Sequence, residues 1–230
     1  MSDGFFHLRG ILFNVMRIIF TLLTVLFLAS CSSAPNEQLQ GHASDLKSHQ
    51  RFGVCYGYGC KHYQKTGLSD AEWGVVRTLF SLDPGSAVEE RQIIAKAIAL
   101  IEQYIGPKTG TDQDKARAIV INLSTDHQMD CIDEAFNSTS YLYLMFQDGL
   151  IKYHVQGTHL RRNFNELSYP HSTATIHEKG TEKTVGNDGH FVVDSWFHKN
   201  GALAEIIPAS LWLGPWYPKD KKERYNFSAS

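Results

Sequence analysis

Residues 130–155 read DCIDEAFNSTSYLYLMFQDGLIKYHV, and this stretch decides the fold class. Most of it carries apolar side chains at helical spacing, which predicts a helix with one buried face. Asp130 is a favourable N-cap and Gly149 a favourable stop, so Cys131 is expected in the first turn of that helix. The last residues of the stretch alternate in polarity, as a β-strand does.

Further helices are predicted before this stretch. Ser followed three residues later by Glu is the capping-box pattern that begins a helix, and it occurs at Ser69 and at Ser86. The second of these helices is expected to stop at Gly106-Pro107, because Gly and Pro together end helices. A third short helix is expected over 114–123.

Strands are predicted after the central helix. Residues 150–155, 171–177 and 190–197 alternate or run apolar, and a polar turn segment separates the last two. Helices first and strands afterwards favour an α+β domain with a largely antiparallel sheet. We assign this domain to residues 51–217.

The N-terminus is predicted to carry an export signal. Residues 18–29 read IIFTLLTVLFLA without a charge, and Arg9 and Arg17 precede them. A membrane-spanning helix needs about 20 apolar residues, so this run suits the core of a signal peptide better. An ordinary cleaved signal without lipidation and an N-terminal anchor helix are the alternatives.

The sequence LASC at 28–31 resembles the lipobox of bacterial lipoproteins. The resemblance implies removal of residues 1–30 as a signal peptide and attachment of fatty acyl chains to Cys31. Two or more acyl chains give stable membrane anchoring where one gives only marginal binding. By the same analogy, Ser32 favours the periplasmic face of the outer membrane over the inner membrane.

The two ends of the mature chain are polar. Residues 31–50 have no apolar periodicity and are expected to form a flexible tether, while 218–230 form a polar tail. The formal net charge is −2 and no polybasic stretch is present, so nucleic acid is not an expected partner.

Four cysteines are present, and they divide by expected role. Cys31 is lipidated if the lipobox is used. Cys55 and Cys60 are close enough to form a disulfide in an oxidising periplasm. Cys131 is then the odd thiol, which is either a reactive group or a small buried apolar side chain.

The positions of Cys131, His171 and Asp194 are compatible with a catalytic site. A helix N-terminus carries about half a positive charge and favours a thiolate, although nearby carboxylates oppose it, so a histidine partner is required. If the two later strands pair with His177 opposite His190, then His171 and Asp194 are diagonal neighbours on one face of the sheet. Asp194 can then orient the imidazole ring.

A helix that opens on Cys, followed by a His-bearing and an Asp-bearing strand, resembles the transglutaminase-like branch of the papain-like fold. The resemblance covers residues 129–198, and the segment GLIKYHVQG at 149–157 is similar to the family's first core strand. It implies that Cys131 is the nucleophile, His171 the base and Asp194 the orienting residue, for hydrolysis or transfer at an amide. The Asp-Cys pair also fits a group of cell-wall endopeptidases that carry Asp-Cys-Ser-Gly.

The expected function is therefore that of an envelope-anchored thiol enzyme acting on a peptide or protein in the periplasm, without a cofactor. Gln128 or a backbone N–H at the helix start is the candidate oxyanion donor. The alternative is a non-catalytic lipoprotein that uses the fold for binding. A metal site at Cys55, Cys60 and His62 is a further reading, but the spacing typical of zinc ligands is missing and no metal is expected.

Overall fold

The computed structural model describes residues 45–81, 83–119, 126–163, 170–182 and 188–219. All of them belong to one unit, Pro35–Ser230. The predicted signal peptide, Cys31 and most of the predicted tether lie outside the described residues. Most of the predicted C-terminal tail lies outside them as well.

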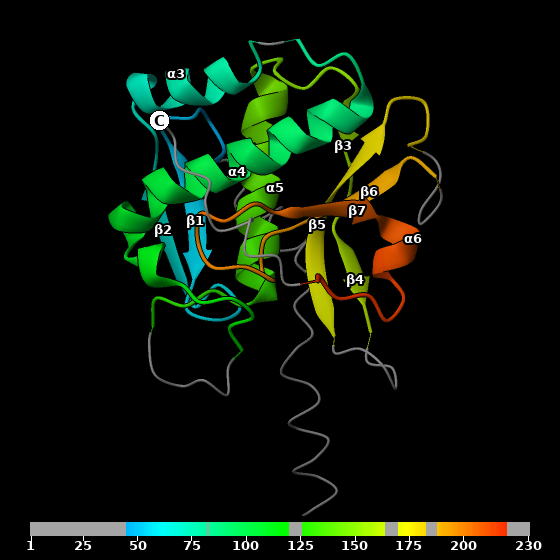
Figure 1. Ribbon diagram of the computed structural model, residues 1–230. Coiled ribbons are helices and arrows are strands. Elements are labelled where there is room, and N and C mark those ends of the chain that lie inside the picture. Colours follow the sequence, from blue (N-terminus) through cyan, green and yellow to red (C-terminus); the bar gives the residue numbers. More distant parts are fainter. Residues whose placement is uncertain (1–44, 82, 120–125, 164–169, 183–187, 220–230) are drawn as a thin grey trace, which may run out of the picture. The chain divides into compact units, whose positions relative to one another are not determined.

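The protein is an α+β protein with helices and strands mixed along the chain (Figure 1). In chain order, the described elements are β1 (Phe52–Tyr56), β2 (His62–Thr66), α3 (Asp70–Leu79), α4 (Ala87–Thr109), the 3-10 helix η2 (Thr111–Gln113), α5 (Cys131–Gln147), β3 (His154–Gln156), β4 (Leu160–Arg162), β5 (His171–Glu178), β6 (His190–Asp194), β7 (Glu205–Pro208) and α6 (Ala209–Trp212).

The strands form two antiparallel sheets. One is the hairpin of β1 and β2, and the other has the order β3-β5-β6-β7 with β4 also paired to β5. Helix α5 lies between the two sheets and contacts β1 on one side and β5 on the other (Figure 1). The end of α5 that carries Cys131 is thus held between the hairpin and the larger sheet.

The main core lies between α3, α4, α5 and one face of the larger sheet. Alternate residues of β5 and β6, such as Ala174, Ile176 and Val193, point into it. Because side chains alternate along a strand, the opposite face of the same strands carries His171 and Asp194.

The sequence correctly predicted the start of each main helix. Ser69 and Ser86 are N-caps whose side chains accept from the backbone N–H three residues on, and Asp130 caps α5. The predicted stop at Gly106-Pro107 is wrong, since α4 continues to Thr109 and ends at the left-handed Gly110. Gly106 is needed for close packing, because a Cβ there would lie 2.9 Å from Asp112 Cα.

The third predicted helix, over 114–123, is wrong for its described residues. Asp114 has an extended backbone and Arg117 has a left-handed φ of 60°. The Asp114 carboxylate accepts the Met129 N–H at 2.7 Å, so this side chain anchors the approach to α5 and does not cap a helix. Residues 120–125 of this prediction lie outside the described residues.

The strand prediction for 150–155 is wrong in most of its length, because β3 begins only at His154. The backbone N–H groups of Lys152 and Tyr153 bind the buried Glu90 carboxylate and are not available for a sheet. The strand over 171–177 is confirmed, whereas the strand from 190 ends at Asp194. Strands β1, β2, β4 and β7 were not predicted.

The folded domain begins earlier than the predicted boundary at residue 51. The His49 ring stacks on Trp73 with 5.3 Å between ring centroids, and His49 and Gln50 both hydrogen-bond to Asp70. The described end of the predicted tether therefore packs against α3.

Candidate catalytic site

The Cys131 thiol lies at the N-terminus of α5, where the sequence builds a reciprocal cap. The Asp130 carboxylate accepts from the backbone N–H groups of Ile132 and Asp133, and the Asp133 carboxylate accepts from the Asp130 N–H at 3.1 Å. This capping box holds the first turn in one conformation. Cys131 is half-buried and, among the described residues, is the cysteine outside a disulfide.

The predicted disulfide between Cys55 and Cys60 is present, and the loop that it closes binds the same end of α5. Residues 57–60 all have left-handed φ values, from 60° to 85°. In this conformation the N–H groups of Tyr58 and Cys60 donate to the two carboxylate oxygens of Asp133, at 2.9 and 2.5 Å. Asp133 therefore joins the disulfide loop to the turn that carries Cys131.

His171 and Asp194 form a buried pair on the larger sheet. Strands β5 and β6 pair with His177 opposite His190, which is the register assumed in the sequence analysis. His171 Nε2 lies 2.7 Å from Asp194 Oδ2, and both residues are 2% exposed. Trp212 Nε1 donates to the same Asp194 oxygen at 2.8 Å.

The thiol lies beside the strand that carries His171. The backbone N–H of Ser172 donates to the Cys131 sulfur and favours its anion. An ionised carboxylate can only accept hydrogen bonds, so Nε2 of His171 carries the hydrogen shared with Asp194. The Nδ1 atom is then a bare acceptor in the neutral ring, and no described residue hydrogen-bonds to it although it is buried.

The surroundings of Cys131 favour the neutral thiol. Burial raises its pKa to about 12, and the negative charges of Asp130, Asp194 and Asp133 add to this effect. The Ser172 N–H opposes the rise without cancelling it. At neutral pH the sulfur is thus protonated, and a base must remove the proton before or during attack.

Aromatic rings enclose the His171 ring. The centroids of Trp196, Phe197 and Trp212 lie 4.5, 5.2 and 5.4 Å from it. These rings keep water from the His171–Asp194 hydrogen bond, which strengthens it electrostatically. The sequence does not reveal the hydrogen bond of Trp212 to Asp194, because that contact depends on how β7 and α6 fold back.

The candidate oxyanion donor Gln128 is already engaged. Its side-chain oxygen accepts from the Lys115 N–H at 3.0 Å and its nitrogen donates to the Gln113 carbonyl at 3.1 Å. The other candidate was a backbone N–H at the helix start. The Asp130 side chain accepts from the N–H groups of Ile132 and Asp133, so the Cys131 N–H is the candidate in this turn that lies outside the cap.

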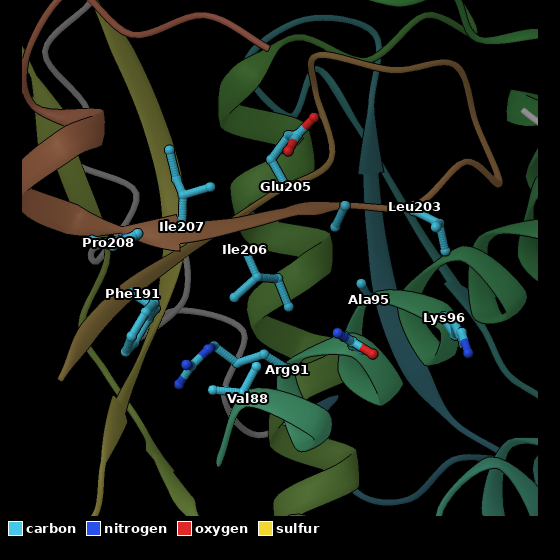
Figure 2. A pocket seen from close by; sticks show the side chains of 12 residues that line it. Val88, Arg91, Ala95, Lys96, Phe191, Leu203, Glu205, Ile206, Ile207 and Pro208 are labelled. Atoms are coloured by element: carbon cyan, nitrogen blue, oxygen red, sulfur yellow. The ribbon is translucent and has the colours of Figure 1, made fainter. Parts of the chain in front are cut away.

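A separate open groove of about 630 Å³ lies between α4 and the β6–β7 edge (Figure 2). Its walls are mainly apolar, with Ile206 at the centre and Lys96 at the rim. Arg91, which also lines it, is held by Glu178 at 2.5 Å and stacks over the Phe191 ring. None of Cys131, His171 and Asp194 lines this groove.

No cluster of three or more possible metal ligands occurs within the described ranges, and none of their helices is long and apolar enough to cross a membrane. No protein-family model, curated protein or solved structure matches the chain.

Proposed function

We propose that the protein is a thiol-dependent amide hydrolase or acyl transferase with the transglutaminase-like form of the papain-like fold. In this proposal Cys131 is the nucleophile, His171 the general base and Asp194 the residue that orients the ring. One observation carries it: the Nε2 edge of His171 is fixed by Asp194, while its buried Nδ1 edge has no described partner and the neighbouring Ser172 N–H binds the thiol.

The reaction follows the roles of these atoms. The Nδ1 lone pair of His171 takes the proton of the Cys131 thiol as the sulfur bonds to the substrate carbonyl carbon, and the carbonyl electron pair moves to oxygen. When the C–N bond breaks, the leaving amine takes the proton from Nδ1. Water or a second amine then attacks the thioester and releases the sulfur.

Because the pKa of Cys131 is raised, the thiol keeps its proton until His171 removes it during attack. The proposed reaction therefore involves general-base catalysis and not a preformed thiolate–imidazolium ion pair. Asp194 favours the imidazolium that forms during proton transfer, and the Cys131 N–H at the head of α5 faces the oxyanion. Only the sulfur of the half-buried residue Cys131 needs to meet the substrate, so His171 can remain enclosed by its aromatic neighbours throughout.

The substrate class follows from the proposed location. A lipid on Cys31 would hold the domain at the periplasmic face of a bacterial membrane, with outer-membrane sorting favoured by Ser32. Peptides and proteins of the envelope offer amides there. The cleaved or transferred bond is therefore proposed to be an amide in such a chain.

Acylation of the full chain by p-nitrophenyl acetate tests the proposal. Attack of the sulfur forms an acetyl thioester and releases p-nitrophenolate, and peptide mass mapping places the acetyl group. We expect stoichiometric acetylation of Cys131 in the native protein, and strong slowing in His171→Ala. Equal labelling of the native and the urea-unfolded protein, or no effect of His171→Ala, would show an ordinary thiol.

The second candidate is a non-catalytic envelope lipoprotein in which Cys131 is a core thiol. The specific observation in its favour is the burial that raises the pKa of Cys131 to about 12. The same acylation assay separates the two candidates, because a core thiol reacts only after unfolding and is indifferent to His171.

A further inference from the structure

Arg162 is a buried cation beside the candidate site. It is the last residue of β4, it pairs directly across from His171 in the β4–β5 ladder, and it is 4% exposed. Sequence reasoning gave this residue no role in the chemistry.

The hydrogen bonds of Arg162 go to neutral groups. Its Nη1 atom donates to the Trp212 carbonyl at 2.9 Å, with the Gly214 and Trp216 carbonyls at 3.5 and 3.4 Å. The guanidinium carbon lies 4.8 Å from the Trp212 ring centroid and 5.5 Å from that of Tyr217. Its Nε atom is buried and has no hydrogen-bond partner among the described residues.

No carboxylate within the described ranges lies at ion-pair distance from this guanidinium. A buried charge is costly unless an opposite charge compensates it, and arginine cannot become neutral by losing a proton. Burial lowers the pKa of Arg162, while Tyr217, Asp194 and Cys131 raise it. Two of those three groups, Asp194 and Cys131, belong to the candidate site, and Arg162 lies directly across from His171 of the same site.

The charges around the Cys131 sulfur are otherwise negative. Asp130 and Asp133 act from α5 and Asp194 acts from β6, and each disfavours the thiolate. His171 on β5 is the proposed proton acceptor. Arg162 on β4 supplies a positive charge that is fixed at every pH at which the protein is folded.

We propose that Arg162 is a positioning residue of this site, whose buried positive charge stabilises the anion formed on the Cys131 sulfur without touching the substrate. This inference rests on the proposed function for its catalytic meaning. The step it assists is the transfer of the thiol proton to Nδ1 of His171, in which no electron is gained or lost. A purely structural role, the anchoring of the chain after α6, is the competing explanation.

The two roles separate when the charge and the packing of residue 162 are changed independently. Arg162→Met keeps an apolar stem against Trp212 without a charge, and Arg162→Gln keeps a hydrogen-bond donor without a charge. Arg162→Lys keeps a charge but loses the planar fork. Arg161→Met, at the exposed neighbouring position, is the matched control.

The measurement is the second-order rate of Cys131 alkylation by iodoacetamide in the full chain, followed between pH 7 and 10 by mass spectrometry of the peptide that contains Cys131. Only the thiolate reacts, so a rise of about one pKa unit slows alkylation about tenfold at each pH below the pKa. We expect this slowing in Arg162→Met and Arg162→Gln, and less than about threefold in Arg162→Lys and Arg161→Met. Near-UV circular dichroism checks that each variant is folded, and either neutral variant suffices if the other does not fold.

Rates in both neutral variants equal to that of the native protein would overturn the inference. Equal slowing of alkylation in Arg162→Lys and Arg162→Met would also overturn the inference. The hydrogen bonds of the planar guanidinium, and not its charge, would then account for the reactivity of Cys131. Alkylation does not depend on amide chemistry, so it separates this inference from the proposed function. If p-nitrophenyl acetate fails to acylate Cys131 but the charge dependence is found, the inference stands and the proposed enzyme does not.

Discussion

Asp194 accepts two hydrogen bonds on one oxygen, from His171 Nε2 at 2.7 Å and from Trp212 Nε1 at 2.8 Å. The two donors come from opposite sides of β6 in the chain, and both are buried. A carboxylate with two such donors has a fixed direction, so the imidazole ring that it binds is fixed as well. This relationship is the most specific feature of the candidate site.

Replacing the carboxylate should therefore impair acylation more than it impairs folding. We expect Asp194→Asn to lower the rate of Cys131 acylation by p-nitrophenyl acetate about 10²- to 10⁴-fold, because an amide cannot favour the imidazolium. The exposed Asp83→Asn is the control for loss of one negative charge. An Asp194→Asn rate within about twofold of that control would contradict the assigned role.

The tryptophan can be tested separately from the carboxylate. Trp212→Phe keeps an aromatic ring next to His171 but removes the N–H that Asp194 accepts. The loss of a buried hydrogen bond to a charged group is expected to cost about 1.5 to 3 kcal/mol in the free energy of unfolding, measured with urea. A change below about 0.5 kcal/mol would mean that this hydrogen bond is replaced when the indole is removed.

The acidity of the thiol gives a prediction with a definite sign. With a pKa of about 12, set by burial and then by Asp130, alkylation of Cys131 should keep rising through pH 10 without a plateau. Asp130→Asn keeps a good N-cap but removes the charge, so the pKa of Cys131 should fall and alkylation at pH 8 should become faster. A plateau near pH 8.5 in the native protein would contradict the described environment.

The parts of this site that the sequence predicted are those with local causes. The cap at Asp130 and the stop at Gly149 depend on residues within one or two helical turns, so they determine where Cys131 lies on α5. Alternation on both strands restricts the pairing to registers that place His171 and Asp194 on the same face, and the pairing of His177 with His190 is one of these.

The unpredicted parts depend on contacts between residues far apart in the chain. Glu90 on α4 accepts hydrogen bonds from the backbone N–H groups of Lys152 and Tyr153, which an extended β3 would have needed for the sheet. No local sequence pattern predicts that a buried carboxylate has this role. Trp212 reaches Asp194 only because β7 adds to the sheet and α6 follows it directly. The charge compensation by Arg162 likewise requires the β4–β5 pairing to be known.

The disulfide that closes the loop against the N-terminal end of α5 should stabilise the fold. Closing the short loop between Cys55 and Cys60 is expected to contribute about 2 kcal/mol by restricting the unfolded chain. Urea unfolding with and without a phosphine reductant measures this difference. The Cys55→Ser/Cys60→Ser double variant should match the reduced protein and should not respond to the reductant. If reduction leaves the native protein's stability unchanged, the loop is held by its hydrogen bonds to Asp133 alone.

Stability should fall as the pH rises from about 5 towards 8, because of buried carboxyl groups behind the site. Glu134, in the first turn of α5, accepts a hydrogen bond from the Ser195 hydroxyl at 2.6 Å, and burial together with the charge of Asp194 raises its pKa to about 7. Burial and Glu134 raise the pKa of Asp114 to about 8.

These shifts determine the sign of the pH dependence. A carboxyl group whose pKa is higher in the folded state holds its proton there while the unfolded chain has lost it. Between the two pKa values the folded state binds more protons, so the free energy of unfolding decreases as the pH rises, by roughly 1 kcal/mol per pH unit for one such group. Glu134→Gln keeps an acceptor for Ser195 without a titrating proton, and it should flatten this dependence between pH 5 and 7.

Glu90→Gln is the matched control, because the pKa of Glu90 is shifted in the opposite direction. Burial raises this pKa, but hydrogen bonds from His154 and from the Lys152 and Tyr153 backbone lower it by more, so the net shift is downward. The ionised Glu90 carboxylate stabilises the fold fully above pH 5. The Glu90→Gln substitution should therefore lower the free energy of unfolding by the same amount at every pH from 5 to 8, without changing its slope against pH. Urea unfolding at pH 5, 6, 7 and 8 measures both variants. A Glu134→Gln curve parallel to that of the native protein would mean that Glu134 is already ionised at pH 5, and that Ser195 binds a carboxylate throughout.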